Sequence, residues 1–175
     1  MSGDLCYDIL LRNLPYKLAG IPAAEFVTHL SRWLEESQYC DAPGALQMRT
    51  FIMNDNRNCF NAIGPGAARA MLALMYFIKG VPLGYTGMDN GHGFFVKKLN
   101  LARKEFPALC RGEALYNKAG ESSSPKVFTV QRKYKKQEIL GAINFSPEVV
   151  DVTLKLPSSF AGETQWTPVK DIPTL

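Results

Sequence analysis

The spacing of the apolar residues changes once along this chain, near Gly112. Before that glycine, apolar side chains recur every three or four residues, as in amphipathic helices. After it they recur every second residue, most regularly over Val150 to Leu156, as in strands with one buried face. Because a helical period does not fit a sheet, nor a two-residue period a helix, the sequence predicts two parts: an α/β part over residues 1–112 and an all-β part over residues 113–175.

The first part is expected to alternate helices with short buried strands. Its apolar spacing predicts four helices, over residues 4–18, 22–37, 67–78 and 95–106. Between them, apolar runs bounded by helix-breaking residues predict strands at Leu46–Met53 and Val81–Tyr85. Strand, helix, strand, helix at this spacing is typical of right-handed β/α units with parallel strands. On the last helix the basic residues are expected to face water: Lys97, Lys98, Arg103 and Lys104.

The second part is expected to form an antiparallel sheet with one face in water. Strand-like runs cover residues 126–134, 138–145 and 150–156, with polar connections between them. The densest basic stretch of the chain lies where the first two runs meet, and it predicts an exposed hairpin turn around Tyr134: Arg132, Lys133, Lys135 and Lys136.

Composition argues against several classes of function. The 20 Lys and Arg are scattered among 16 Asp and Glu, which indicates a mixed surface rather than a nucleic-acid footprint. The cysteines lie far apart, and only His29 and His92, both expected at the surface, could join them, so neither a disulfide framework, a metal site nor a cofactor is expected. The four cysteines are Cys6, Cys40, Cys59 and Cys110.

No apolar run reaches the roughly 18 residues of a membrane span, and the N-terminus lacks a basic segment. As written, the chain is expected in the cytoplasm and off the membrane, although an excised piece would have lost any signal peptide.

Three segments follow one another in a set order. The apolar run from Phe51 ends in Asn54-Asp55-Asn56 with Arg57 behind it, and Gly80–Asp89 has a Gly-x-Pro turn, a later glycine and an acid. The helix Lys98–Leu109 then leads to Gly112. In this order and spacing, the segments resemble the last third of the α-amylase family of glycoside hydrolases, family 13. The resemblance implies the final units of a (β/α)8 (TIM) barrel over residues 1–112 and a truncated, antiparallel β-sandwich-like domain over residues 113–175.

Family members hydrolyse α-glucosidic bonds with a carboxylate nucleophile and a carboxylic acid, supplied by the fourth and fifth barrel strands. No segment of this chain resembles those strands. The resemblance therefore implies a fragment or degenerate hydrolase of starch or malto-oligosaccharides that is inactive by itself. An alternative is a non-catalytic glucan-binding or protein-interaction module derived from the family, and a third is an unrelated α+β protein.

Asp55 is the candidate for a third family carboxylate, which helps the transition state. It takes that position only with a one-residue deletion; without a gap, Asn56 does, and the family's neighbouring histidine is missing. Four further residues are candidates for substrate binding: Asn54, Arg57, Tyr85 and Asp89, the last standing where the family usually has Glu. The alternatives are a polar turn at Asn54–Asn56 and a packing role for Tyr85.

A chain of 175 residues cannot cover an apolar helix such as Ala67–Ile78 together with two open strand edges. Open edges pair readily with other chains. A homo-oligomer or a partner chain is therefore expected to cover them.

Overall fold

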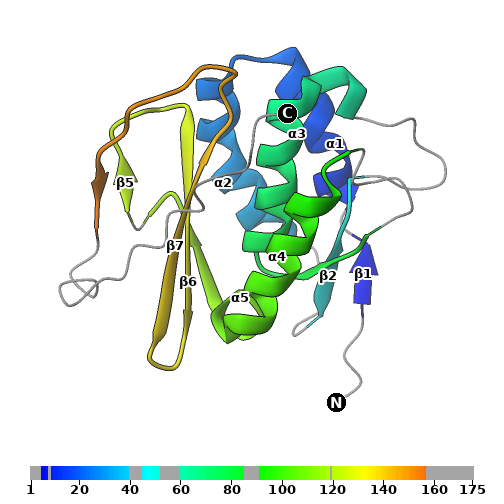
Figure 1. Ribbon diagram of the computed structural model, residues 1–175, viewed down its shortest axis with the longest axis vertical. Helices are drawn as coiled ribbons and strands as arrows, with labels where there is room; N and C mark the ends of the chain where they lie inside the picture. Colours follow the sequence, from blue (N-terminus) through cyan, green and yellow to red (C-terminus); the bar gives the residue numbers. More distant parts are fainter. Residues whose placement is uncertain are drawn as a thin grey trace.

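The computed structural model describes residues 5–7, 9–39, 45–51, 60–84, 91–118 and 120–156. Helices form a middle layer between a parallel sheet and an antiparallel sheet (Figure 1). The first part of the chain contains β1 (Leu5–Tyr7), α1 (Ile9–Gly20), α2 (Ala23–Tyr39), β2 (Leu46–Arg49), α3 (Phe60–Phe77), β3 (Val81–Pro82), α4 (Gly93–Glu105) and α5 (Pro107–Arg111). The second contains β4 (Glu113–Tyr116), β5 (Glu121–Ser122), β6 (Val127–Tyr134), β7 (Gln137–Asn144) and β8 (Leu154–Lys155).

The first sheet has the order β1-β2-β3, and all its strands are parallel. The two predicted parallel strands, each followed by a helix, are thereby confirmed as β2 with α3 and β3 with α4, although the strands end earlier than predicted, at Arg49 and Pro82. The single helix predicted over residues 4–18 is wrong at its start, because Leu5–Tyr7 pair with β2 and α1 begins only at Ile9. Three residues are too few to show a period, so only pairing with β2 identifies this strand. The described residues form no closed barrel.

The central strand β2 has polar side chains toward the helices. Gln47 Nε2 donates to Ser37 O of α2 at 2.9 Å, and Arg49 Nε donates to Lys79 O at 2.7 Å. Because side chains alternate along a strand, Leu46 and Met48 lie on the other face, in one row with Val81. Leu46 and Val81 are 41% and 40% exposed. The face of the sheet that points away from the helices is therefore apolar and partly open.

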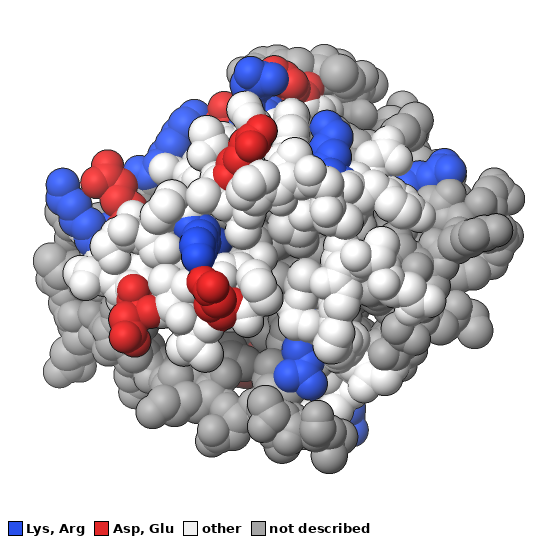
Figure 2. Space-filling model, turned by 90° about the horizontal axis from the view of Figure 1, so that it is seen from above, with Lys and Arg blue, Asp and Glu red and all other residues white. Residues whose placement is uncertain are grey.

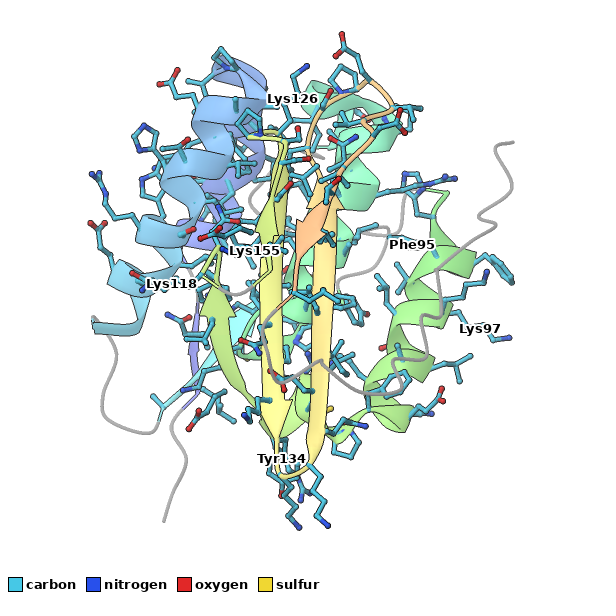
Figure 3. The ribbon with its side chains drawn as sticks, turned by 90° about the vertical axis from the view of Figure 1, so that its left-hand side faces the viewer. Phe95, Lys97, Lys118, Lys126, Tyr134 and Lys155 are labelled. Atoms are coloured by element: carbon cyan, nitrogen blue, oxygen red, sulfur yellow. The ribbon has the colours of Figure 1, made fainter. Side chains whose placement is uncertain are left out.

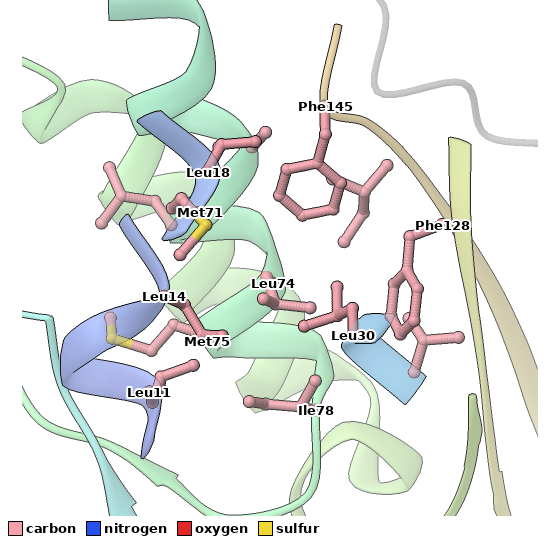
Figure 4. Packing of buried hydrophobic residues seen from close by; sticks show 14 of the residues in the cluster. Leu11, Leu14, Leu18, Leu30, Met71, Leu74, Met75, Ile78, Phe128 and Phe145 are labelled. Carbon is pink, nitrogen blue, oxygen red and sulfur yellow. The ribbon is translucent and has the colours of Figure 1, made fainter. Parts of the chain in front are cut away.

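Helix α3 lies at the centre of the molecule, as its apolar sequence predicts. It is kinked at Gly64, whose φ of 75° suits glycine, and Pro65 begins its longer part. In Figure 4, its buried residues Met71, Leu74 and Met75 meet residues of α1 on one side and those of the antiparallel sheet on the other. The residues from these neighbours are Leu11, Leu14, Leu18, Phe128 and Phe145. One hydrophobic core thus spans both parts of the chain.

The antiparallel sheet has the order β4-β6-β7, and its β6–β7 hairpin confirms two predicted strands and the predicted turn at Lys135 and Lys136. Tyr134 lies at the tip of the hairpin in Figure 3. The expectation of one wet face is wrong for β6, which is buried on both faces from Val127 to Arg132. The segment that contains β5 covers the face of this sheet that points away from the helices. It packs closely there, because a Cβ atom added at Gly120 would lie only 2.6 Å from the side chain of Leu140 on β7.

The strand predicted over residues 150–156 is mostly wrong. Only Leu154 and Lys155 form a strand, which pairs with β5. Residues 150–153 are neither strand nor helix, and Val152 is exposed. The alternation marks only a partly buried side here, because Val150, Leu154 and Leu156 are half-buried. The segment stays close to the residues that follow β5, since Ser123 N donates to Thr153 O at 3.0 Å.

Three arginines donate to the carbonyl groups at the C-terminal end of α3. Arg132 Nη1 donates to Phe77 O and Ile78 O, both at 2.8 Å, and its Nη2 donates to Gly112 O at 2.9 Å. Arg103 donates to Tyr76 O and Gly80 O, while Arg49 donates to Lys79 O. Helix ends leave such carbonyls unpaired and carry partial negative charge, so the arginines satisfy and neutralise this end.

Two of these arginines correct the sequence predictions. Arg132 is fully buried rather than part of an exposed turn, and Arg103 is half-buried rather than facing water. Burial lowers the pKa of the Arg132 guanidinium to about 10 and also lowers the pKa of Arg103. With a pKa of about 10, the Arg132 guanidinium remains charged at neutral pH. The spacing of apolar residues predicts which side chains are buried. It does not show that a buried helix end needs a positively charged side chain.

Candidate functional site

The segments that carry the predicted site follow two neighbouring strands. β2 and β3 are parallel, so the chain leaves both at the carboxyl-terminal end of the sheet. In β/α barrels this end of the sheet carries the active site. The candidate residues themselves lie outside the described residues and stay predictions: Asn54, Asp55, Arg57, Tyr85 and Asp89.

The carboxyl-terminal end of the sheet, from which both segments start, is held in place by packing and hydrogen bonds. Thr50 and Phe51, the last described residues before the first segment, are buried, and Phe51 belongs to the hydrophobic core. Beyond β3, Leu83 N donates to Arg49 O at 2.8 Å, which continues the pairing of the two strands. Both segments therefore start from ordered neighbouring positions.

His92 corrects the expectation of a solvent-exposed histidine. It lies just before α4 and is 8% exposed, and its Nδ1 accepts a hydrogen bond from Arg69 Nε of α3 at 3.2 Å. In this contact Nδ1 is the acceptor and the Arg69 guanidinium is the donor. The end of the second segment is thus joined to α3. Arg69 was not predicted as a site residue, although it is the one charged residue in Ala67–Ile78.

His29 is half-buried and stacks on Trp33, with the ring centroids 5.5 Å apart. Trp33 meets the core through an edge contact with Phe26, while Lys17 Nζ lies 3.9 Å from the centre of its ring. This aromatic group therefore serves the packing of α1 and α2.

The carboxyl groups of the described residues all reach solvent at least in part. A general acid in these enzymes has a raised pKa, which burial commonly produces, and no Asp or Glu is among the buried described residues. A hydrogen bond from Lys126 lowers the pKa of the exposed Glu148 instead. Within the described residues, no group of His, Cys, Asp and Glu could hold a metal ion, and Cys110 is exposed and free.

An apolar groove of about 450 Å³ lies between α1, α2, the start of α3 and the end of β7. It is lined by Leu18, Ala19, Ile21, Ala23, Ala62, Ile63, Gly64, Pro65, Gly66, Ala67, Phe145 and Pro147. None of these side chains titrates or forms hydrogen bonds, so the groove cannot support acid–base chemistry.

Charged side chains of both signs are dispersed over the face shown in Figure 2 and form no basic tract there. Among the described helices, none combines the length and apolar character needed to cross a membrane.

The sequence matches no protein family, and no curated protein matches it. The fold is similar to the crystal structure of a noncanonic maltogenic alpha-amylase, AmyB, from Thermotoga neapolitana, with a TM-score of 0.63 and 17% sequence identity. The likeness covers 81% of this chain and 38% of that chain, so this chain spans well under half of the amylase. At this identity the likeness concerns the fold: mixed helices and strands that resemble part of an α-amylase structure.

Proposed function

We propose that this chain is a fragment or degenerate member of the α-amylase family of glycoside hydrolases, which contributes to α-glucan binding but does not hydrolyse glucans alone. The likeness to a maltogenic alpha-amylase over 81% of the chain carries the proposal. It supports the resemblance of three sequence segments to the same family. The parallel β2–α3 and β3–α4 units carry the first two of these segments.

Residues 1–112 are proposed to be the last units of a (β/α)8 barrel, and residues 113–175 a truncated β-sandwich-like domain. In such barrels the helices surround the strands, and branched apolar side chains fill the interior. The arrangement of β2 supports this assignment, because Leu46 and Met48 lie on the face opposite the helices. A sheet that stood alone with this face in water would be expected to be polar there.

Asp55 is proposed as the relic of the family's third carboxylate, with Asn54, Arg57, Tyr85 and Asp89 as sugar contacts. Their segments leave neighbouring parallel strands at one edge, which supports a shared site. Hydrogen bonds from polar groups and stacking on an aromatic ring hold a sugar without any chemistry.

Binding of maltoheptaose tests this proposal directly. Millimolar affinity is expected, on the order of −4 kcal/mol, because few subsites are present. Asp55→Ala and Tyr85→Ala should each weaken it several-fold, as followed by NMR chemical-shift titration. Asp151→Ala, at an exposed position, serves as the control and should leave the affinity unchanged. Equal affinity in all four proteins would contradict the proposed site.

The outward face of the parallel sheet is proposed to be covered by a second copy or a partner chain. For the purified chain, sedimentation velocity should therefore show self-association that increases with concentration. The double variant Leu46→Lys/Val81→Lys should sediment as a monomer, because two charges oppose burial of this face. Leu115→Lys, which adds a charge at an exposed apolar position of β4, is the control. A wild-type chain that stays monomeric at high concentration would exclude a second copy as the cover of this face.

The second candidate function is a non-catalytic protein-interaction module. The lack of a buried carboxylate among the described residues favours it. Codons before Met1 that continue in frame into nucleophile and acid motifs would favour the hydrolase fragment instead.

A further inference from the structure

The apolar groove between α1, α2, the start of α3 and the end of β7 is lined by small and apolar residues alone. Leu18 and Phe145 belong to the hydrophobic core, and alanines and glycines form much of the remaining lining. Short side chains leave room for a large one, and no lining residue carries a charge. The groove therefore suits a bulky apolar side chain.

The described part of the chain ends at Leu156, and residues 157–175 follow it. From Trp166 on, every third residue of this segment is apolar, and Pro168 and Pro173 lie between these positions. Three residues per turn is the period of the polyproline II helix, and prolines lack the N–H group that a central sheet strand must donate. The pattern therefore favours an extended segment with one apolar side, of the kind that docks in apolar grooves. The apolar positions are Trp166, Val169, Ile172 and Leu175.

This segment starts within reach of the groove. Leu154 of β8 pairs with Ser122, and four residues further along, Lys126 O accepts a hydrogen bond from Phe145 N at 3.1 Å. With about 3.8 Å between consecutive Cα atoms, Leu154 lies no more than about 26 Å from Phe145. The 12 residues from Leu154 to Trp166 can span about 40 Å. The outward face of the parallel sheet lies on the far side of the helix layer (Figure 1), so the groove is the nearer apolar surface.

We propose that residues 157–175 dock in this groove of the same chain, with the indole ring of Trp166 seated in it. Docking removes the apolar surface of the ring and of the groove from water at the same time, which is favourable. Lys170 and Asp171 fall between the apolar positions of the three-residue repeat and stay in water. The proposal depends neither on the glucan-related function nor on the outward face of the parallel sheet.

Tryptophan fluorescence tests the docking. Trp33 is the one other tryptophan of the chain, so Trp33→Phe leaves Trp166 as the single emitter. In this background the emission should lie to the blue of free tryptophan, and acrylamide should quench it several-fold less than in the same chain unfolded in urea. Gly66→Glu adds a carboxylate to the groove, where nothing lies within 4 Å of the new Cβ atom. It should make Trp166 as accessible to acrylamide as in the unfolded chain, because a charge opposes burial of the ring beside it.

Gly66→Ala and Ala142→Glu are the matched controls. The first adds a Cβ atom at the same position without a charge, and the second adds the same charge at an exposed alanine of β7 that does not line the groove. Both should leave Trp166 shielded, and circular dichroism should show that all variants keep their helix content.

A Trp166 ring that is as accessible in the folded parent as in the unfolded chain would overturn the proposal, as would shielding that persists in Gly66→Glu. Shielding that disappears on dilution would mean that a second copy covers the ring, which also overturns it. Exposure of Trp166 by Leu46→Lys/Val81→Lys, but not by Gly66→Glu, would place the ring on the parallel sheet instead of in the groove.

Discussion

Replacing Arg132 by methionine is expected to lower the free energy of unfolding by about 3–5 kcal/mol. The guanidinium donates to three main-chain oxygens, those of Phe77, Ile78 and Gly112. Methionine fills similar space but donates nothing, and each buried carbonyl left without a donor costs roughly 1–3 kcal/mol. The loss of stability is partly offset, because the variant no longer buries a positive charge whose Nε lacks a hydrogen-bond partner in the described part of the chain.

Urea unfolding followed by circular dichroism measures this effect. The control is Lys133→Met, because Lys133 is the next residue along β6 and is exposed; it should change stability by less than about 0.5 kcal/mol. Arg132→Lys should lie between wild type and Arg132→Met, since an ammonium group keeps the charge but lacks the planar fork of donors. A methionine variant as stable as wild type would show that these hydrogen bonds contribute nothing net.

The 175-residue chain alone is expected to release no sugar from soluble starch or from a chromogenic maltoside. Enzymes accelerate such reactions by about 10⁶- to 10¹⁷-fold, and glycosidases depend for this on two carboxyl groups placed on either side of the bond. No segment of the sequence resembles the strands that supply them in the family, and no carboxyl group is buried among the described residues. Asp55 by itself cannot replace the pair.

The assay is to be repeated with Asp55→Ala. Turnover that disappears in this variant would show that the chain has its own catalytic carboxylates and would refute the expectation. Turnover that persists unchanged would identify a contaminating hydrolase, which a second purification from a different host should remove.

The elements with a clear apolar period were predictable from the sequence. The predicted helix over residues 22–37 is α2, and the runs over 126–134 and 138–145 are β6 and β7. In α2, burial on one face repeats over several turns, so the pattern outweighs local exceptions. β6 is buried on both faces, and it was predictable only as a strand-like run between polar connections. β1 and the start of the strand predicted at 150–156 differ from the prediction, because short segments follow their pairing partner more than their own pattern.

Part of the candidate site was predictable in the same way. The sequence placed its two segments after two parallel strands, and β2 and β3 are indeed neighbours. The buried contact of His92 with Arg69 was not predictable, because these residues lie on different elements and their distance depends on how α3 packs beside α4. The five proposed site residues themselves remain predictions.

The sequence by itself determined the longer helices and strands, the change of period near Gly112, and the order of segments that resembles an α-amylase. These follow from local spacing, because burial of one face requires a fixed period. Only the tertiary structure decided that Arg49, Arg103 and Arg132 meet at the end of α3 and that β6 is buried on both faces. Such contacts join residues far apart in the chain, and their free energy depends on burial and on paired carbonyl groups, which no local pattern contains.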